Sequence, residues 1–517
     1  MPHPWLQAGI LILATAAHAE TLHVSARSGS RNGDGSESRP FATISAALEV
    51  AVAGDDVVVA PGRYREHVVL ASGVALRGSG AGTILDATDF PLAGAVSCAD
   101  EASIEGFRIV DPGRAQALLA AIDCSNGASP EIAHNVIEAP QRPAILLEDS
   151  DAWIHHNTIR GGAPSTETLF GVIVGRGRPV IEDNEIASNA VAIGLECPPG
   201  DGGARIRRNV LRGRVGVGPP AGLFSVPVTI SDNVFLPSVA EFPVRSGLIL
   251  LAELFFPFGT LAAQVANNTF HGTDGIFVAG GDAVIANNVV VNGTVGISVN
   301  SGVTPELRAN DVFGNATSLV ENTNYLGIPD PTGSDGNLSL DPQLADVLGD
   351  DFRPRPGSPV IDAGSDADVV SEQDLDGDAR IADGDGAGGA AVEMGAQELQ
   401  PGEEPPLPTL GVRVDLLPKR DPNLLSLDRI LRGKGRVAVA VFSDDDFDAA
   451  EVDVASLTLG ASPVRRCEAK HVDRDGARDL LCRFPVGGIP LSGPVCVRGA
   501  TLAGRALLGC DVAQIAP

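Results

Sequence analysis

One short pattern of apolar and polar positions recurs along the first two thirds of the chain. It consists of an apolar residue, two variable residues, an asparagine, another variable residue and an apolar residue, as in IAHNVI from Ile132 and IHHNTI from Ile154. The asparagines of its eight copies are Asn135, Asn157, Asn184, Asn209, Asn233, Asn268, Asn288 and Asn310. Successive asparagines lie 20 to 35 residues apart, and such a period is typical of a solenoid in which each repeat forms one coil.

A second recurring run, here called the G-I-x-V run, lies between the asparagine frames, as in AILLEDS around Leu147 and GVIVGRG around Val174. Each coil therefore has three short β-rich runs, one before the asparagine, one after it, and the G-I-x-V run. Alternating apolar positions point inward, and coils stack at about 4.8 Å. The pattern predicts an all-β fold, a parallel β-helix of ten to twelve coils with three strands per coil. Stacked asparagine amides would satisfy backbone groups at one turn.

The N-terminal part has a different pattern. Strands are expected at Val57–Ala60 and His67–Leu70, after a short helix that begins near Pro40 and ends by Gly54. A helix at this place would cover the open end of the solenoid, whose unpaired strand edge is otherwise an aggregation hazard.

The stretch DGSESRPFATISAALEVAVAGDDVVVAPGRYREHVVL resembles the N-terminal cap of secreted bacterial right-handed β-helix proteins of the pectin-lyase-like superfold. The asparagine frames look like the short repeat of these proteins, and the segment from Asp341 to Glu398 is similar to the stretch that closes such helices. The resemblance implies a right-handed parallel β-helix domain over residues 20–398, and parallel crossovers have the same bias of hand.

The two ends of the chain have other compositions. Residues 1–19 contain an apolar run followed by Ala17-His18-Ala19, which predicts a cleaved signal peptide and hence a secreted or cell-surface protein. No other apolar run is long and clean enough to span a membrane. Residues 399–411 form a Pro-rich linker, and residues 412–517 resemble a small β-rich module appended to secreted bacterial proteins.

Charge and cysteine content narrow the partners and the compartment. The net charge is -29, and the first lysine is Lys419, so nucleic acid and strongly anionic polymers are disfavoured as partners. Among the seven cysteines, Cys98 and Cys124 occupy one position of consecutive coils and are predicted to form a disulfide, whereas Cys197 is predicted to be a free thiol. The last domain could form two further bridges of undetermined pairing, from Cys467, Cys482, Cys496 and Cys510.

Candidate chemistry is sparse. The adjacent histidines His155 and His156 flank the asparagine of one frame, where the residue types vary freely, so they are interpreted as ordinary surface and turn positions rather than as a site. The absence of lysine from the helix excludes a Lys base, and the motifs of polygalacturonase-like hydrolases are not found together. Fold by itself does not give function.

The best candidate for a binding site is the G-I-x-V face, where β-helix enzymes and glycan binders commonly work. Aligning its runs places Asp123 and Glu148 about 5 Å apart in consecutive coils. The neighbouring outward column is apolar, with Leu146, Ile173, Ile249 and Phe277. The predicted substrate-binding residues are Asp123, Glu148, Asp149 and Glu196. Alternatively, the carboxylates are ordinary solvated surface, and a loop inserted between Asn233 and Asn268 buries the apolar column.

Two Asp-rich stretches suggest calcium, with ordinary turn chemistry as the alternative. The predicted ligands are Asp374, Asp376, Asp378 and Asp385 in DLDGDARIADGD, and Asp473, Asp475 and Asp479 in KHVDRDGARDL.

Two functions remain open at this point. The first is a non-catalytic secreted or surface β-helix that binds a polysaccharide or serves an envelope or matrix role. The second is a carbohydrate-active lyase or hydrolase that uses carboxylates of the G-I-x-V face on a glycan that is not strongly anionic.

Overall fold

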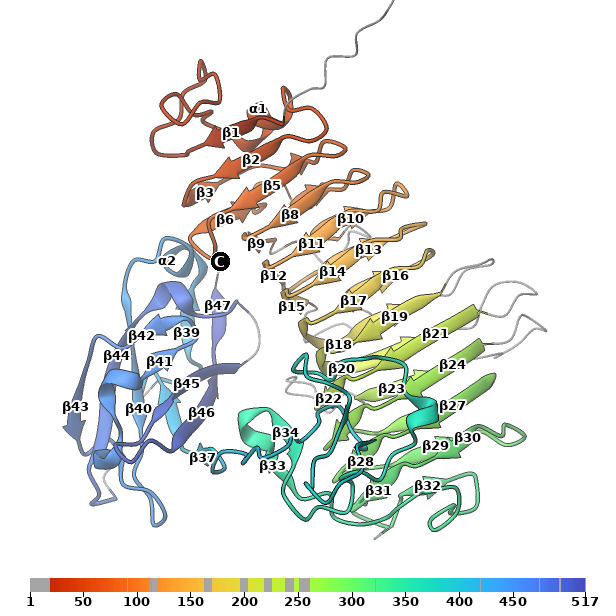
Figure 1. The fold of residues 1–517 in the computed structure, drawn as a ribbon. Helices are drawn as coiled ribbons and strands as arrows, with labels where there is room; N and C mark the ends of the chain where they lie inside the picture. Colours follow the sequence, from red (N-terminus) through yellow and green to blue (C-terminus); the bar gives the residue numbers. More distant parts are fainter. Residues whose placement is uncertain are drawn as a thin grey trace, which may run out of the picture.

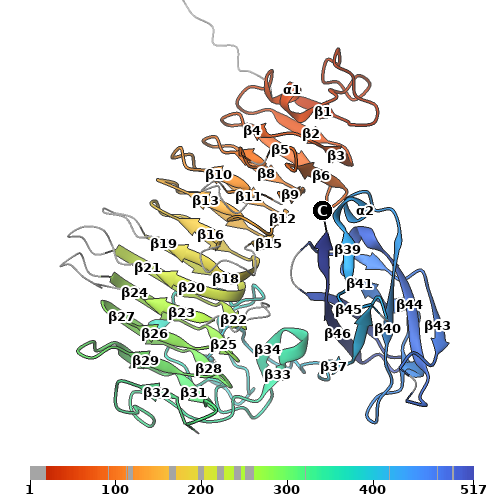
Figure 2. The same cartoon turned by 180° about the vertical axis from the view of Figure 1, so that it is seen from behind.

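A computed structural model describes residues 19–516 except 91, 112, 114–119, 162–169, 196–202, 218–225, 238–245, 251–260, 321, 419, 474, 492 and 493. Its largest part is a stack of parallel coils that runs from the N-terminal cap to about residue 326, and a separate β-rich domain lies beside this stack (Figures 1 and 2). The predicted all-β parallel solenoid with a smaller C-terminal β-domain is confirmed.

The strands that precede the asparagines form a parallel sheet of twelve strands, here called the first sheet. Its isoleucines stack in register through the core, for example Ile132 on Ile154 and Ile154 on Ile181, and all three are fully buried. The strands are β1 (Thr21–Val24), β2 (Asp56–Val59), β5 (Ala75–Gly78), β8 (Ser103–Glu105), β11 (Glu131–Ala133), β14 (Trp153–His155), β17 (Val180–Glu182), β19 (Ala204–Arg207), β21 (Val226–Ser231), β24 (Leu261–Ala266), β27 (Asp282–Ala286) and β30 (Glu306–Arg308).

The strands after the asparagines form a second row. They are β3 (Gly62–Tyr64), β6 (Thr83–Asp86), β9 (Arg108–Val110), β12 (Val136–Ala139), β15 (Thr158–Gly161), β18 (Glu185–Leu195), β20 (Val210–Val217), β22 (Val234–Leu236), β25 (Thr269–His271), β28 (Val289–Val291) and β31 (Asp311–Phe313).

The G-I-x-V runs form a third row, which the long strands β18 and β20 join to the second because each pairs in both rows. The other strands of the third row are β4 (Val68–Val69), β7 (Val96–Ser97), β10 (Ile122–Cys124), β13 (Ile145–Leu147), β16 (Phe170–Val174), β23 (Gly247–Leu250), β26 (Ile276–Val278), β29 (Ile297–Val299) and β32 (Tyr325–Leu326).

A ladder of asparagines joins the first sheet to the second row. The side-chain oxygen of each asparagine accepts the backbone N–H of the asparagine one coil earlier, as Asn184 does from Asn157 at 2.9 Å and Asn209 from Asn184 at 3.0 Å. The eight predicted members are all stacked in this way, and Asn337 extends the ladder by one. The predicted role of the asparagines is therefore confirmed.

The N-terminal helix is α1 (Ile44–Leu48), shorter than predicted, with the Thr43 side chain accepting from the N–H of Ala46 at its start. The carboxylate of Glu66 accepts the N–H groups of Ile44 and Ser45, both at 2.9 Å. These bonds satisfy donors that a helix terminus otherwise leaves unpaired, so the short helix can pack on the first coil.

After the last coil, the chain returns along the outside of the stack. Its residues contact the corner between the first sheet and the second row: Ser365 N–H donates to Asn287, Arg380 pairs with Asp232 at 2.6 Å, and Ala396 N–H donates to Thr269. The segment that resembles the closing stretch of such β-helices thus also covers one side of the stack of coils. Its elements are β33 (Leu344–Asp346), η1 (Val347–Gly349), β34 (Asp351–Pro354), η2 (Asp366–Asp368), β35 (Ile381–Ala382) and β36 (Ala391–Val392).

The C-terminal domain is built from small sheets with their own apolar core around Val439, Leu457 and Phe484. Within the predicted linker, Leu399 is buried and Leu410–Gly411 already pairs with a strand of this domain. One sheet contains β37 (Leu410–Gly411), β41 (Thr458–Leu459), β42 (Ser462–Pro463), β45 (Pro494–Ala500) and β46 (Ala506–Val512). The others contain β38 (Val414–Leu416), β40 (Arg436–Val441), β43 (Arg466–Lys470) and β44 (Asp479–Pro485), and β39 (Leu424–Ser426) with β47 (Gln514–Ala516). The helices are α2 (Leu427–Leu431), η3 (Ala449–Glu451), η4 (Val454–Ser456) and η5 (Val486–Gly488).

The disulfides agree with the predicted framework and complete it. Cys98 bonds Cys124 in the next coil, as predicted. In the C-terminal domain the pairing left open by the sequence is Cys467 with Cys482 and Cys496 with Cys510. Cys197, the predicted free thiol, lies outside the described residues.

Candidate functional site

The predicted stacking of Asp123 on Glu148 is wrong by two residues. In the third row Asp123 pairs with Leu146, and Leu147 pairs with Val174. Register follows the buried residues, Ile122 on Ile145 and Cys124 on Leu147. A slip of two residues would keep each side chain on its face of the sheet, but it would place the charged Asp149 next to the buried Cys124. Asp123 therefore lies in the same outward column as Leu146 and Ile173, not in the column beside it.

The predicted carboxylates have local partners. Asp123 is almost fully buried and accepts the N–H of Ser125 at 2.9 Å, as in an Asx turn. Glu148 and Asp149 both pair with Arg176, at 2.9 and 3.1 Å. Glu196 lies outside the described residues. The three described carboxylates thus do not form an open acid–base pair.

The apolar column itself is present as predicted. Leu146 pairs with Ile173 in the next coil, and further along the row Ile249 pairs with Phe277. All four side chains are partly exposed. The residues 238–245 and 251–260, which could cover the column, lie outside the described residues, so the covering-loop alternative stays untested.

A cavity of about 420 Å³ lies over the later half of this column. Its apolar part is formed by Ile249, Phe277 and Leu326, which follow one another down the third row with Ser298 between the last two. An apolar surface beside convergent polar groups is typical of a small-molecule site.

Polar groups surround the apolar part of the cavity. Arg214 on β20 is partly buried, and no described residue forms an ion pair with its guanidinium; burial lowers its pKa from the ordinary value. Asp274 accepts a hydrogen bond from the hydroxyl of Thr294, and Ser298 contributes a further hydroxyl. Sequence reasoning selected the face and its apolar column but missed Arg214, in the middle of the long strand β20, and Asp274, in the turn before β26, because neither belongs to the aligned runs.

A larger cleft of about 620 Å³ lies between the second row and the C-terminal domain. It is bordered by Arg160, Arg212 and His271 on the stack, and burial lowers the pKa of His271. Arg212 is already paired with Asp350 at 2.8 Å. This cleft is the space left where the two domains dock.

The predicted calcium ligands do not converge. Asp374 is fully buried, and its carboxylate accepts the N–H groups of Asp376, Asp378 and Glu398 at 2.8 to 2.9 Å. This is turn chemistry, the alternative considered for the loop. Asp385 instead lies with Asp362 and Asp383, where the three carboxylates offer oxygens within 4.8 Å of one another.

The aspartates of the second Asp-rich stretch also bind separate local partners. Asp473 pairs with Arg413 at 2.6 Å, and Asp475 accepts the N–H of Ala477. Asp479 is buried and accepts from the N–H groups of Ser443 and Val472. In the described part of the chain these residues do not form a group of three metal-ligating side chains, and calcium binding stays a prediction.

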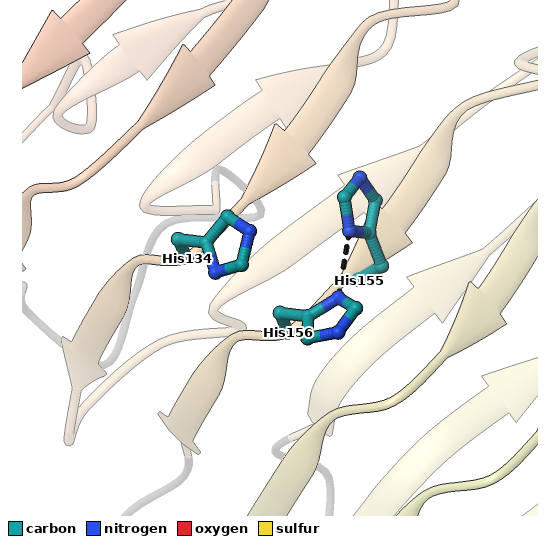
Figure 3. A group of neighbouring side chains, drawn as sticks. All are labelled: His134, His155 and His156. Carbon is teal, nitrogen blue, oxygen red and sulfur yellow. Dashed lines mark hydrogen bonds between the residues drawn. The ribbon is translucent and has the colours of Figure 1, made fainter. Parts of the chain in front are cut away.

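The structure adds one cluster that the sequence interpretation set aside. His155 and His156 lie beside His134 of the preceding coil, and each of the three offers a ring nitrogen within 4.8 Å of the others (Figure 3). The aligned frames IAHN and IHHN already place His134 over His156. This recurrence of a histidine at one position of two consecutive repeats is the sequence signal that could have identified the cluster.

Comparison with known proteins gives a short match to a family model. Residues 27–69 match the family described as "Protein of unknown function (DUF1565)". No curated protein matches the chain. No helix of the described residues has the length and apolar character needed to cross a membrane.

Several solved structures have a similar architecture. A complex of XylC with xylose has a TM-score of 0.46 at 12% identity, and the match covers 73% of this chain and 98% of XylC. The pectate lyase Pel9A has a TM-score of 0.39 at 14% identity, over 73% of this chain and 96% of that protein. The PL6 family alginate lyase AlyGC has a TM-score of 0.38 at 14% identity, over 68% of this chain and 60% of that chain.

Proposed function

We propose that this protein is a non-catalytic, secreted or surface-associated β-helix that binds a polysaccharide through the third row of its coils. The observation that carries the proposal is the cavity over Ile249, Phe277 and Leu326, with Arg214 and Asp274 beside them. A sugar ring has an apolar face and a rim of hydroxyls, and this arrangement offers an apolar surface next to both a donor and an acceptor.

The form of the surface favours an extended ligand. The outward column has one residue per coil, and Gly194 and Gly216 separate its first apolar part, Leu146 and Ile173, from its second, Ile249 and Phe277. Coils repeat at about 4.8 Å, so a glycan chain lying along the cavity would meet Ile249, Phe277 and Leu326 within four consecutive coils. The net charge of -29 favours a neutral glycan over a polyanion.

The compartment is inferred from covalent chemistry. Three disulfides support an oxidising environment, as outside the cell. The segment that suggests a signal peptide, residues 1–18 with the cleavage pattern ending at Ala19, lies almost entirely outside the described residues.

The test is a binding titration over a panel of neutral and uronate polysaccharides with the Phe277→Ala variant. We expect the wild-type protein to bind one neutral class and Phe277→Ala to bind it about 30-fold more weakly, as for loss of an aromatic contact worth about 2 kcal/mol. Leu146→Ala is the matched control, since Leu146 is in the same column but does not line the cavity.

Equal weakening by both variants, or no effect of either, would contradict this location of the site. The enzymatic alternative is tested on the same panel by assays for reducing ends and unsaturated products. We expect no product, and turnover of any polysaccharide would replace the binding proposal with a catalytic one.

A further inference from the structure

His134 and His156 occupy equivalent turn positions in consecutive coils. Each directly precedes a ladder asparagine, and each has a left-handed backbone with φ of 55°. The ladder fixes this turn because Asn135 and Asn157 are hydrogen-bonded to one another at 3.0 Å. The two imidazoles therefore lie side by side, with ring centroids 4.8 Å apart. The backbone turn places them there, so the position does not depend on a contact between the rings.

His155, at the end of β14, completes the group from the side. Its ring is nearly buried, stacks on Trp153 with a centroid distance of 3.9 Å, and places Nε2 3.0 Å from Oε1 of Glu131. Because a carboxylate accepts, Nε2 carries the proton and Nδ1 keeps its lone pair. Nδ1 of His155 faces Nδ1 of His156 at 2.9 Å.

This arrangement has the features of a metal site rather than of a loose surface group. A carboxylate that holds the far nitrogen of a ligating histidine is the usual second shell of a protein metal site. Two nitrogens bound at about 2.1 Å to one tetrahedral ion are about 3.4 Å apart. The His155–His156 contact of 2.9 Å would therefore open slightly, and the ring nitrogen of His134, within 4.8 Å of the others, would turn toward the ion. Figure 3 shows the three rings gathered at one turn of the coil.

The corner that carries these histidines is accessible in this part of the stack. Farther along, the same turn position is occupied by Asp232, Asn267 and Asn287, which contact the returning segment. His134 and His156 are exposed. An ion held there would retain a coordination position facing solvent.

We propose that His134, His155 and His156 bind one divalent transition-metal ion such as Zn²⁺, through one ring nitrogen each, with water at the open position. Imidazole nitrogens are borderline ligands that suit Zn²⁺ and its neighbours, whereas Ca²⁺ and Mg²⁺ require oxygen ligands. The site is on a different corner of the coils from the cavity on the third row, so it does not depend on the proposed function.

The test uses the full-length protein without an affinity tag, freed of metal by chelation and titrated with Zn²⁺ by calorimetry. We expect one Zn²⁺ per chain in the wild type and at least 100-fold weaker binding in His134→Ala, whose exposed side chain can be removed without opening the core. Glu131→Gln should weaken binding by about 10- to 100-fold, as expected for a second-shell carboxylate. His271→Ala is the control, because His271 lies outside the cluster.

Two further readouts make the outcome decisive. Co²⁺ in place of Zn²⁺ should give visible d–d absorption in the wild type that is lost in His134→Ala, and circular dichroism should show that both proteins are folded. Ca²⁺ should not compete with Zn²⁺. The proposal is overturned if the wild type fails to bind Zn²⁺ stoichiometrically, or if His134→Ala binds it as tightly as the wild type does.

Discussion

At the scale of single residues, Asp311 is the clearest example of a carboxyl group whose charged form is disfavoured by burial in the stack. Its side chain is fully buried, one oxygen accepts the N–H of Leu340 at 2.9 Å, and the other has no hydrogen-bond partner. Burial, together with the nearby charge of Asp341, raises the pKa of Asp311 to about 7. The folded protein therefore favours the protonated acid.

This pKa predicts a dependence of stability on pH. Between the ordinary value of 3.8 and about 7, the folded state binds more protons at this site than the unfolded state. The contribution of Asp311 to stability is therefore fully present below pH 3.8 and is lost as the pH rises to about 7. The Asp311→Asn variant should lack this component. The difference in free energy of unfolding, variant minus wild type, should therefore rise by up to about 4 kcal/mol between pH 4 and pH 8.

Thermal unfolding of both proteins across this range provides the measurement, since pH effects common to the two cancel. Asp282→Asn removes a negative charge from an exposed position and serves as the control. A constant difference between Asp311→Asn and wild type at all pH values would show that Asp311 is ionised in the folded protein.

At the scale of elements, the asparagine turn determines how one coil sits on the next. The Asn184 side chain accepts from the backbone N–H of Asn157 and donates to the carbonyl groups of Ile154 and Glu182. The Asn184 side chain is buried, so water cannot replace these bonds. The G-I-x-V strands have no comparable polar marker, which is why their register was misassigned at Asp123 although the apolar column was found.

We predict that Asn184→Ala lowers the free energy of unfolding by about 2 to 6 kcal/mol, because it leaves at least one buried donor and one buried acceptor unpaired. Asn300→Ala, at an exposed turn of the third row, should change it by less than about 0.5 kcal/mol. Denaturant unfolding followed by circular dichroism measures both. Equal stability of the two variants would contradict a structural role for the ladder.

At the scale of the whole molecule, one ion pair of the stack connects it to the C-terminal domain. Arg108 and Glu138 are buried and paired at 2.7 Å. Arg108 donates to the carbonyl groups of Gly487 and Ile489, and Glu138 accepts the N–H of Leu491. Both side chains thus use their remaining hydrogen-bonding capacity on the docked domain.

Removing one member of a buried pair leaves the other uncompensated, at a cost of about 3 to 5 kcal/mol. We therefore expect Arg108→Ala to release the C-terminal domain and to accelerate proteolysis between residues 399 and 411, leaving two folded fragments. Arg160→Ala, two coils further along the second row, is the matched control, and its cleavage should follow the wild type. Unchanged cleavage of Arg108→Ala, or cleavage mainly outside this segment, would argue against a separable domain held at this contact.

The sequence by itself determined the features that depend on local repetition. The asparagine frames, the alternation of apolar residues and the paired positions of Cys98 and Cys124 predict the stacked coils because each coil must bury the same face on the next. Only the tertiary structure decided which side chains meet across coils and across domains. The pairing of Asp123 with Leu146 and the buried contact of Arg108 depend on register and docking. The aligned frames place His134 over His156, but only the structure shows that His155 joins them. The repeat pattern does not reveal such contacts, because polar side chains outside the core are not constrained by the period of the repeat.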